Sequence, residues 1–397
     1  MTKLKLYGNL DAPGFYNTRD FLRRSVVEYD WTDIAEEPPT IQFPDGEIVV
    51  NPSVEDVAKR LGWITQPRYE EYDVSIYGAG PAGLSAAVYA ASEGLKTVLV
   101  EKEAVGGQAG TSSLIENYMG FPNGITGAEL AERARQQALK FGVEILLLRE
   151  GIKGTFKDNR MCVELAGGAR LVAKSNICAT GIEYEKLGLP NEQAFFHQGI
   201  YYGAGATEAC FCRGKDIFVV GGGNSAGQAA SYFSQFARKV YMVIRKGNLS
   251  ESMSDYLLKR LVRIENVEIL YHAQVTEVEG DHELRRIRIS TAGQADKWYD
   301  STKLFICIGG NPNTDWAQEN GILRDSRGYL ITGTDLLTCA GFSGCWTLDR
   351  PPYHLETSLP GSFAVGDVRY GSVKRVASAV GEGAMAVTLV HKYLAEI

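Results

Sequence analysis

The sequence predicts an α/β fold with two nucleotide-binding units and a small α/β module before them. Three observations predict this fold. A strand, a glycine-rich turn, a helix and a second strand follow one another from residue 74, and the same order recurs from residue 216. The first 70 residues show a different order of short elements. With 397 residues, the chain is long enough for two or three domains.

Composition excludes several classes of protein. Hydrophobic residues make up 45% and charged residues 22% of the chain, so wholesale disorder is excluded. The net charge is −7 and no long basic run is present, which argues against nucleic-acid binding. We see neither a long apolar run nor an apolar leader, and we expect no membrane span and no signal peptide. Seven irregularly spaced cysteines favour a reducing cytoplasm, and no metal site is predicted.

The first 70 residues predict a compact unit of alternating elements. We expect a strand at 3–7, an amphipathic helix at 18–27, a hairpin at 41–50 and a helix from 52 to about 61. The hairpin turn contains proline and glycine, which supply turn geometry. Residues 64–72 are polar and read as a linker.

The first nucleotide-binding unit begins with the strand at 74–77. Its turn allows the backbone to approach a pyrophosphate, and the following helix points its N-terminus at the phosphates. Glu101 ends the next strand, where a carboxylate can accept a hydrogen bond from a ribose hydroxyl. The glycines of this G-x-G-x-x-G pattern are Gly78, Gly80 and Gly83.

The second unit has the pattern G-x-G-x-x-A at residues 221–226. Its second strand, at 239–244, is followed by Arg245 and Lys246 instead of an acid. Two cations at this place could pair with a 2′-phosphate, so the sequence favours NADPH over NADH.

Over residues 72–397 the chain resembles the low-molecular-weight thioredoxin reductase family of two-domain flavoproteins. The order and spacing of the matching motifs fit along this whole stretch. They are GAGPAG (78–83), GGQ (106–108), IENYMGFP (115–122), ATG with LGLP (179–190), GGGNSA (221–226), CIGGNPNT (307–314) and AVGDVRYGSVKRVASAVGEGAMA (364–386).

The resemblance implies two Rossmann-like domains, one inserted in the other. The FAD domain would comprise residues 72–188 and 309–397, and the NADPH domain would comprise residues 189–308. The helix after Lys374 would point its N-terminus at the flavin pyrimidine ring and stabilise negative charge there. The resemblance implies FAD contacts for Gly78, Gly80, Gly83, Glu101, Gly107, Gln108, Asn117, Asp367, Lys374, Arg375 and Val376. It implies NADPH contacts for Gly221, Gly223, Asn224, Ser225, Arg245 and Lys246.

Two departures separate this chain from the family pattern. The family carries Cys-x-x-Cys and an aspartate just before the strand of the second unit, and this pair passes electrons from flavin to thioredoxin. Here the residues are Ala204-Gly205-Ala206-Thr207, followed by Glu208, so the usual redox disulfide is absent. The family also has a further arginine where this chain has Ser250, which weakens the preference for NADPH.

Glu208, Cys210 and Cys212 are the candidate catalytic residues. Glu208 could protonate a leaving group beside a flavin, or it could be a structural or surface carboxylate that caps nearby backbone. Cys210 and Cys212 could form a strained, easily reduced disulfide, or they could be small apolar residues at the start of a buried strand.

The N-terminal module resembles a glutaredoxin-like or thioredoxin-like fold whose chemistry has been removed. After the first strand, the Cys-x-x-Cys of such folds would fall at residues 11–16, and this chain has DAPGFY there. Such a degenerate module could cover the active site, dock a partner or stabilise a dimer.

The sequence therefore predicts an FAD-dependent, NADPH-linked oxidoreductase of the thioredoxin reductase type. It would pass electrons from reduced flavin directly to a small disulfide, quinone or metabolite, as a cytoplasmic homodimer. One alternative is a disulfide reductase that uses Cys210 and Cys212 as the relay, with a thioredoxin-like protein as partner. Another is a flavin-binding sensor or electron-transfer partner that does not turn over NADPH.

Overall fold

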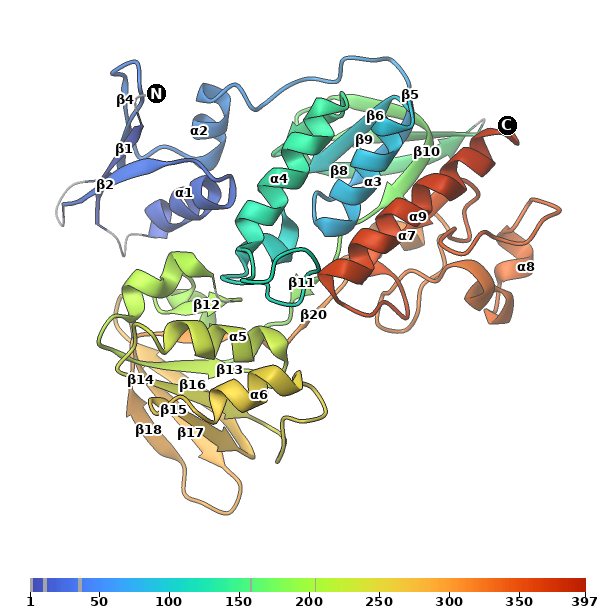
Figure 1. Ribbon diagram of the computed structural model, residues 1–397. Coiled ribbons are helices and arrows are strands. Elements are labelled where there is room, and N and C mark those ends of the chain that lie inside the picture. Colours follow the sequence, from blue (N-terminus) through green and yellow to red (C-terminus); the bar gives the residue numbers. More distant parts are fainter. Residues whose placement is uncertain (1–2, 10–12, 35–37, 158, 204) are drawn as a thin grey trace.

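The computed structural model describes residues 3–9, 13–34, 38–157, 159–203 and 205–397 (Figure 1). Three units follow from its sheets: the N-terminal module, an outer unit, and an inserted unit that interrupts the outer one. No helix within these ranges is both long and apolar enough to cross a membrane.

The N-terminal module is a four-stranded sheet with two helices. The sheet order is β2-β1-β3-β4, with β1 parallel to β2 and the other pairs antiparallel. The predicted helix lies earlier than expected, and the strand β2 was not predicted at all. The elements are β1 (Leu4–Gly8), α1 (Pro13–Arg24), β2 (Tyr29–Asp33), β3 (Thr40–Gln42), β4 (Ile48–Val50) and α2 (Val54–Arg60).

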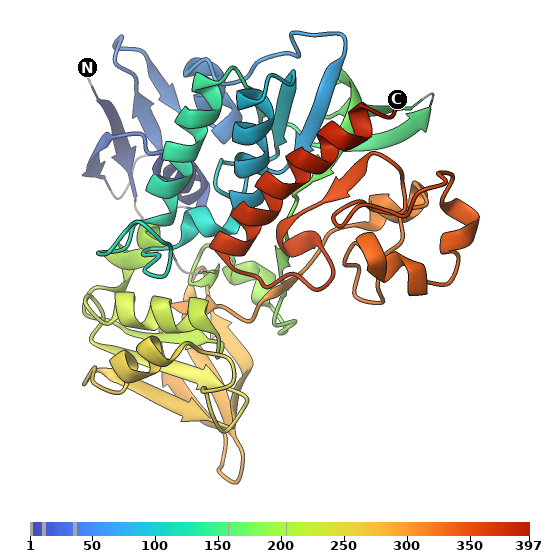
Figure 2. The same ribbon diagram turned by 45° about the vertical axis from the view of Figure 1, so that its right-hand side comes forward.

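The outer unit is built on a seven-stranded sheet in the order β7-β6-β5-β10-β9-β8, with β21 also paired to β10. Helices α3 and α9 lie side by side on the sheet (Figures 1 and 2). The first half contains β5 (Tyr72–Tyr77), α3 (Pro81–Ser92), β6 (Thr97–Glu101), η1 (Gly107–Thr111), α4 (Gly127–Lys140), β7 (Glu144–Leu147), β8 (Gly151–Lys157), β9 (Arg160–Leu165) and β10 (Arg170–Cys178). The second half contains α7 (Asp315–Glu319), η4 (Gly333–Thr338), α8 (Phe342–Cys345), β21 (Ser362–Ala364), η5 (Gly366–Val368) and α9 (Val376–Leu394).

The inserted unit has a five-stranded parallel sheet, β12-β19-β13-β14-β15, and a three-stranded antiparallel sheet, β16-β17-β18. Its elements are η2 (Glu192–Phe195), β12 (Ile200–Tyr202), η3 (Ala206–Cys212), β13 (Asp216–Val220), α5 (Asn224–Phe233), β14 (Lys239–Ile244), α6 (Asp255–Leu261), β15 (Val267–Tyr271), β16 (Ala273–Gly280), β17 (Leu284–Thr291), β18 (Lys297–Asp300) and β19 (Leu304–Ile306).

The chain leaves and re-enters the outer unit through a short antiparallel pair, β11 (Glu183–Tyr184) and β20 (Gly310–Asn311). A Cβ at Gly310 would lie 1.9 Å from the Glu183 carbonyl oxygen, so only glycine permits this close crossing. A second link joins α6 to the outer unit: the Arg260 guanidinium donates two 2.7 Å hydrogen bonds to the Glu116 carboxylate.

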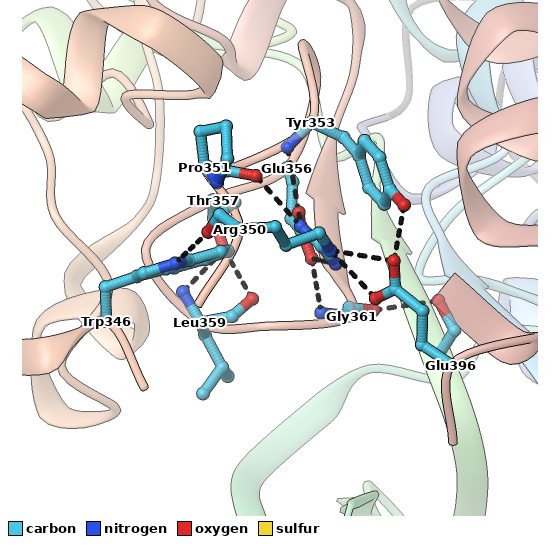
Figure 3. A network of polar contacts seen from close by, with 10 residues as sticks. Trp346, Arg350, Pro351, Tyr353, Glu356, Thr357, Leu359, Gly361 and Glu396 are labelled. Atoms are coloured by element: carbon cyan, nitrogen blue, oxygen red, sulfur yellow. Dashed lines mark hydrogen bonds and ion pairs between the residues drawn. The ribbon is translucent and has the colours of Figure 1, made fainter. Parts of the chain in front are cut away.

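A buried ionic network holds the segment between α8 and β21 in place (Figure 3). Glu356, which is fully buried, accepts hydrogen bonds from Arg350 at 2.7 and 3.1 Å and from the amides of Tyr353 and Gly361 at 2.9 Å each. Arg350 also pairs with Glu396 beyond α9. The network therefore ties the segment after α8 to the C-terminal end of the chain.

Candidate functional site

The first glycine turn forms a cradle in front of α3. Gly78 has φ +101°, and a Cβ there would lie 2.4 Å from the Ala179 carbonyl oxygen. Gly80 is the N-cap of α3 and forms no side-chain cap. A Cβ at Gly80 would have only Gly107 Cα within 4.0 Å, so the free amides of the first helical turn open onto clear space. This arrangement fits a dinucleotide pyrophosphate.

Glu101 stands at the edge of this cradle, as the sequence predicts. Its buried carboxylate accepts hydrogen bonds from the amides of Ala79 at 2.7 Å and Glu103 at 2.8 Å. Burial raises the pKa of Glu101. Each oxygen keeps a second lone pair, which can accept from a ribose hydroxyl.

The second half of the outer unit closes onto the same cradle. A Cβ at Gly366 would lie 3.0 Å from Ala82 Cβ, so η5 packs on the first turn of α3. This packing brings Asp367 beside the cradle, and burial raises the pKa of its carboxyl. Lys374, with φ +56°, donates to the Asp367 carbonyl oxygen at 3.4 Å. Arg375 is the N-cap of α9, forms no side-chain cap and precedes Val376, the first residue of the helix.

The remaining residues implied for this site differ in their surroundings. Gln108 follows Gly107 in η1, and its amide nitrogen donates to the Ile182 carbonyl oxygen at 2.7 Å. Asn117 is exposed, next to the Glu116 that pairs with Arg260. The FAD roles of both side chains remain predictions.

The inserted unit repeats the cradle at α5. Gly221 has φ +138°, and a Cβ there would lie 2.2 Å from the Cys307 carbonyl oxygen. Gly223 is the N-cap of α5 and forms no side-chain cap, and a Cβ there would have only the Ser252 carbonyl oxygen, at 3.9 Å, within 4 Å. Ser225 is exposed, but the Asn224 side-chain oxygen accepts from the Ser254 amide at 2.7 Å. Asn224 therefore supports the start of α6.

Arg245 and Lys246 are exposed just beyond β14. The Lys246 ammonium lies 3.2 Å from the Glu251 carboxylate. Ser250, at the position of the family arginine, donates to the Asn248 side-chain oxygen. These two cations are thus presented at the strand end nearest the cradle in front of α5, where a 2′-phosphate would be expected.

Glu208 is a buried residue of η3, and its carboxylate accepts hydrogen bonds from two donors. The Tyr16 hydroxyl donates to Oε1 at 2.5 Å, and the Gly205 amide donates to Oε2 at 2.8 Å. Glu208 is therefore not a surface carboxylate, although it does cap the backbone. Burial, reinforced by the nearby Asp20 carboxylate, raises the pKa of Glu208. A carboxyl group of this kind can hold a proton closer to neutral pH.

The start of η3 lies against the end of η1. A Cβ at Gly205 would lie 3.0 Å from the Thr111 carbonyl oxygen, which ends η1. Because η1 carries Gly107 and Gln108, Glu208 lies at the junction between the two units.

The two cysteines lie on η3, and the expectation that they begin a buried strand is wrong. Both are free thiols. Cys210 is exposed and donates to the Thr207 carbonyl oxygen at 3.4 Å, and the Arg19 guanidinium donates to its sulfur at 3.6 Å. Cys212 is fully buried and donates to the Glu208 carbonyl oxygen, and burial raises its pKa to about 12.

Sequence reasoning missed the contribution of α1. Residues 11–12 of the DAPGFY stretch lie outside the described residues, but its last residue, Tyr16, meets Glu208. Thr207 donates weakly to Asp20 at 3.5 Å, and Arg19 lies over the Phe211 ring. The only signal in the sequence was the amphipathic pattern of α1, which does not indicate what its faces contact.

Helix α1 contacts the outer unit as well. The Arg24 guanidinium donates to the carbonyl oxygens of Ala104 at 3.1 Å and Gly107 at 3.4 Å. Phe21 packs with Ala104 and Trp63 in a small apolar cluster. The N-terminal module therefore contacts both units around η3 and η1. Among the described residues, no cluster of three or more Cys, His, Asp or Glu could hold a metal ion.

Comparison with known proteins gives consistent results. Residues 72–383 match the family model "Pyridine nucleotide-disulphide oxidoreductase". The thioredoxin reductase of Bacillus subtilis is 33% identical over 328 residues, which are 82% of this chain and 96% of that protein. The crystal structure of Lactococcus lactis thioredoxin reductase in its FR conformation superposes with a TM-score of 0.72 at 28% identity, over 82% of this chain and 100% of that one. The crystal structure of T. acidophilum thioredoxin reductase also gives a TM-score of 0.72 at 28% identity, over 82% of this chain and 99% of that one.

Proposed function

The chain belongs to the pyridine nucleotide-disulphide oxidoreductase family, and we propose that it passes electrons from NADPH through FAD directly to a small acceptor, with Glu208 as the proton donor. It is an FAD-dependent NADPH oxidoreductase with Rossmann-type FAD and NADPH domains. Bound FAD would supply two-electron transfer from NADPH to the acceptor. The chain itself would bind and orient FAD and NADPH, and Glu208 would protonate the acceptor.

The binding roles follow from the two cradles. The amides in front of α3 and the Glu101 carboxylate would hold the FAD pyrophosphate and ribose. The amides in front of α5 would hold the NADPH pyrophosphate, with Arg245 and Lys246 facing the 2′-phosphate.

The single observation that carries the proposal is the carboxyl group of Glu208. It lies where η3 meets η1, is almost fully buried, and has its pKa raised by burial. A buried carboxyl whose pKa is raised can act as a general acid toward an acceptor.

The surroundings of η3 support a small acceptor. Helix α1 covers this helix, with Tyr16 on Glu208 and Arg19 on Cys210. A protein acceptor would have to displace the module to reach Glu208, which favours a smaller acceptor.

The decisive test is an anaerobic titration of the purified protein with NADPH. We expect prompt loss of the oxidised flavin absorbance, followed by its return when a quinone or a low-molecular-weight disulfide is added. No loss of absorbance would overturn the proposal and favour the sensor that ignores NADPH.

The cysteines provide a second prediction. Burial raises the pKa of Cys212 to about 12, and residues two positions apart on a helix do not face each other, so we expect no relay through Cys210 and Cys212. The double variant Cys210→Ser, Cys212→Ser should reduce its acceptor at the parental rate, and thiol titration after NADPH reduction should find no additional thiols. Two new thiols would support the alternative disulfide reductase with a thioredoxin-like partner.

Arg245 provides a third prediction. Replacing it with glutamine removes a charge-assisted contact to the 2′-phosphate, so KM for NADPH should rise about tenfold while KM for NADH stays within about twofold. The matched control is Arg238→Gln, at the other end of β14, where Arg238 pairs with Asp216. Equal changes for both coenzymes, or the same effect in the control, would contradict the assignment.

A cytoplasmic location and a homodimer follow from the resemblance and remain predictions. The same holds for the domain boundaries at residues 70, 188 and 308.

A further inference from the structure

Tyr16 connects the N-terminal module to the proposed proton donor. Its hydroxyl donates to Glu208 Oε1, although the two residues are 192 positions apart. This hydrogen bond joins a helix of the module to the helix that stands in place of the family's redox disulfide.

The Tyr16 ring is held from the side of the inserted unit. It packs edge-on against the His197 ring with centroids 4.3 Å apart and lies 5.5 Å from the Tyr201 ring. It also packs against the apolar core around β13 and α5. With the ring fixed in this way, the hydroxyl oxygen is held beside the Glu208 carboxyl.

Docking of the module does not depend on this hydroxyl. Phe21 packs with Ala104, and Arg24 holds the backbone of the outer unit. These contacts are made without the Tyr16 oxygen, so its bond to Glu208 needs another explanation.

We propose that Tyr16 is a positioning residue of the active site, which holds the Glu208 carboxyl in place for proton transfer to the acceptor. The N-terminal module thereby completes the site. This inference rests on the proposed function, because Glu208 must be the proton donor.

The proton balance is simple. NADPH gives the acceptor two electrons and one proton as a hydride equivalent, and Glu208 gives the second proton from its carboxyl group. The carboxylate left behind is buried, and a buried anion is costly unless donors compensate it. The Tyr16 hydroxyl and the Gly205 amide supply those donors until solvent returns a proton to Glu208.

Several titratable or charged groups face this carboxyl and must be considered in any pH dependence. They come from α1, from β11, from the residue after β19 and from η3 itself. They are Tyr16, Asp20, Tyr184, Cys307 and Cys212, with Lys303 and Arg24 acting on neighbouring members of the group.

The test uses the full-length Tyr16→Phe variant, which keeps the ring and removes only the donor. The first readout is thermal unfolding between pH 5 and pH 9. Without the Tyr16 donor the carboxylate form of Glu208 is less stable, so the loss of Tm should be small at low pH and grow as the pH rises. A module contact with only a packing role would lower Tm equally at every pH, and that result would overturn the inference.

Two controls accompany this measurement. Tyr7→Phe removes another module hydroxyl, which bonds Gln42 away from the site, and should show no pH-dependent difference. Adding Tyr16→Phe to Glu208→Gln should abolish the pH dependence, because no titrating carboxyl remains.

The second readout is turnover with two probes. 1,4-Benzoquinone needs protons when it is reduced, whereas ferricyanide does not. We expect Tyr16→Phe to lower NADPH-dependent quinone turnover about tenfold. In the pH profile of quinone turnover, the loss of activity at alkaline pH should move to higher pH. Ferricyanide turnover should be unchanged. Equal loss with both probes, or no loss with quinone, would overturn the inference. If NADPH fails to reduce the wild-type flavin, the proposed function fails, while the thermal measurement still tests the Tyr16–Glu208 bond.

Discussion

Replacing Glu208 with glutamine should lower NADPH-dependent quinone reduction by about 10²- to 10⁴-fold, the usual contribution of a general acid. Glutamine has nearly the same shape, can accept from the Gly205 amide and can donate to the Tyr16 oxygen, but it has no acidic proton. Anaerobic reduction of the flavin by NADPH should proceed at the parental rate, because hydride transfer does not use this proton. Stopped-flow absorbance separates the two half-reactions.

Glu192→Gln is the matched control. Glu192 is also buried in the inserted unit and also accepts from a tyrosine, Tyr202, and from a backbone amide, that of Leu189. Its replacement should leave quinone reduction within about twofold of the parent. A Glu208→Gln enzyme that reduces quinone at the parental rate would remove Glu208 from the mechanism.

The same variant should change how stability depends on pH. The pKa of Glu208 is raised in the folded state, so its contribution to stability is present at low pH and is lost as the pH rises through that raised value. The glutamine variant carries no such group. Its Tm should therefore exceed that of the parent at alkaline pH and approach it at acidic pH.

Replacing Glu356 with alanine should cost about 3–5 kcal/mol of unfolding free energy, the usual loss when one partner of a buried ion pair is removed. The substitution leaves the Arg350 guanidinium and the amides of Tyr353 and Gly361 without their shared acceptor (Figure 3). Urea unfolding followed by far-UV circular dichroism measures the change. Turnover per folded molecule should be unaffected, because the network lies outside both cradles.

Glu396→Gln is the control for this experiment. Glu396 binds the same arginine, but its side chain is partly exposed, so its loss should cost no more than about 1 kcal/mol. If the two variants are equally stable, burial of Glu356 does not determine the strength of the network.

The nucleotide cradles could be predicted from the sequence because their determinants are local. Gly78 and Gly221 are needed for backbone geometry within a few residues of each strand end, and Glu101 is placed by the end of its own strand. A short sequence pattern therefore predicts both the turn and the kind of ligand that the turn binds.

The N-terminal module shows where such reasoning fails. Strand β2, YDWTD, has only partly buried and exposed residues, so no alternation of apolar residues marked it. One of the two interpretations of Cys210 and Cys212 places them at the start of a buried strand, but Glu208 caps the backbone at Gly205 and the segment forms a short helix. No local pattern could pair Tyr16 with Glu208, because that contact depends on how the units pack.

The contacts of α1 with both units also have a consequence for folding during synthesis. During synthesis, Glu208 emerges from the ribosome 192 residues after its partner Tyr16. The partners of Arg24, Ala104 and Gly107, emerge about 80 residues after Arg24. The outer unit is itself incomplete until α9 has emerged. Docking of α1 on both units therefore cannot be complete before Glu208 has emerged, so a fully docked α1 marks a chain whose inserted unit has begun to form.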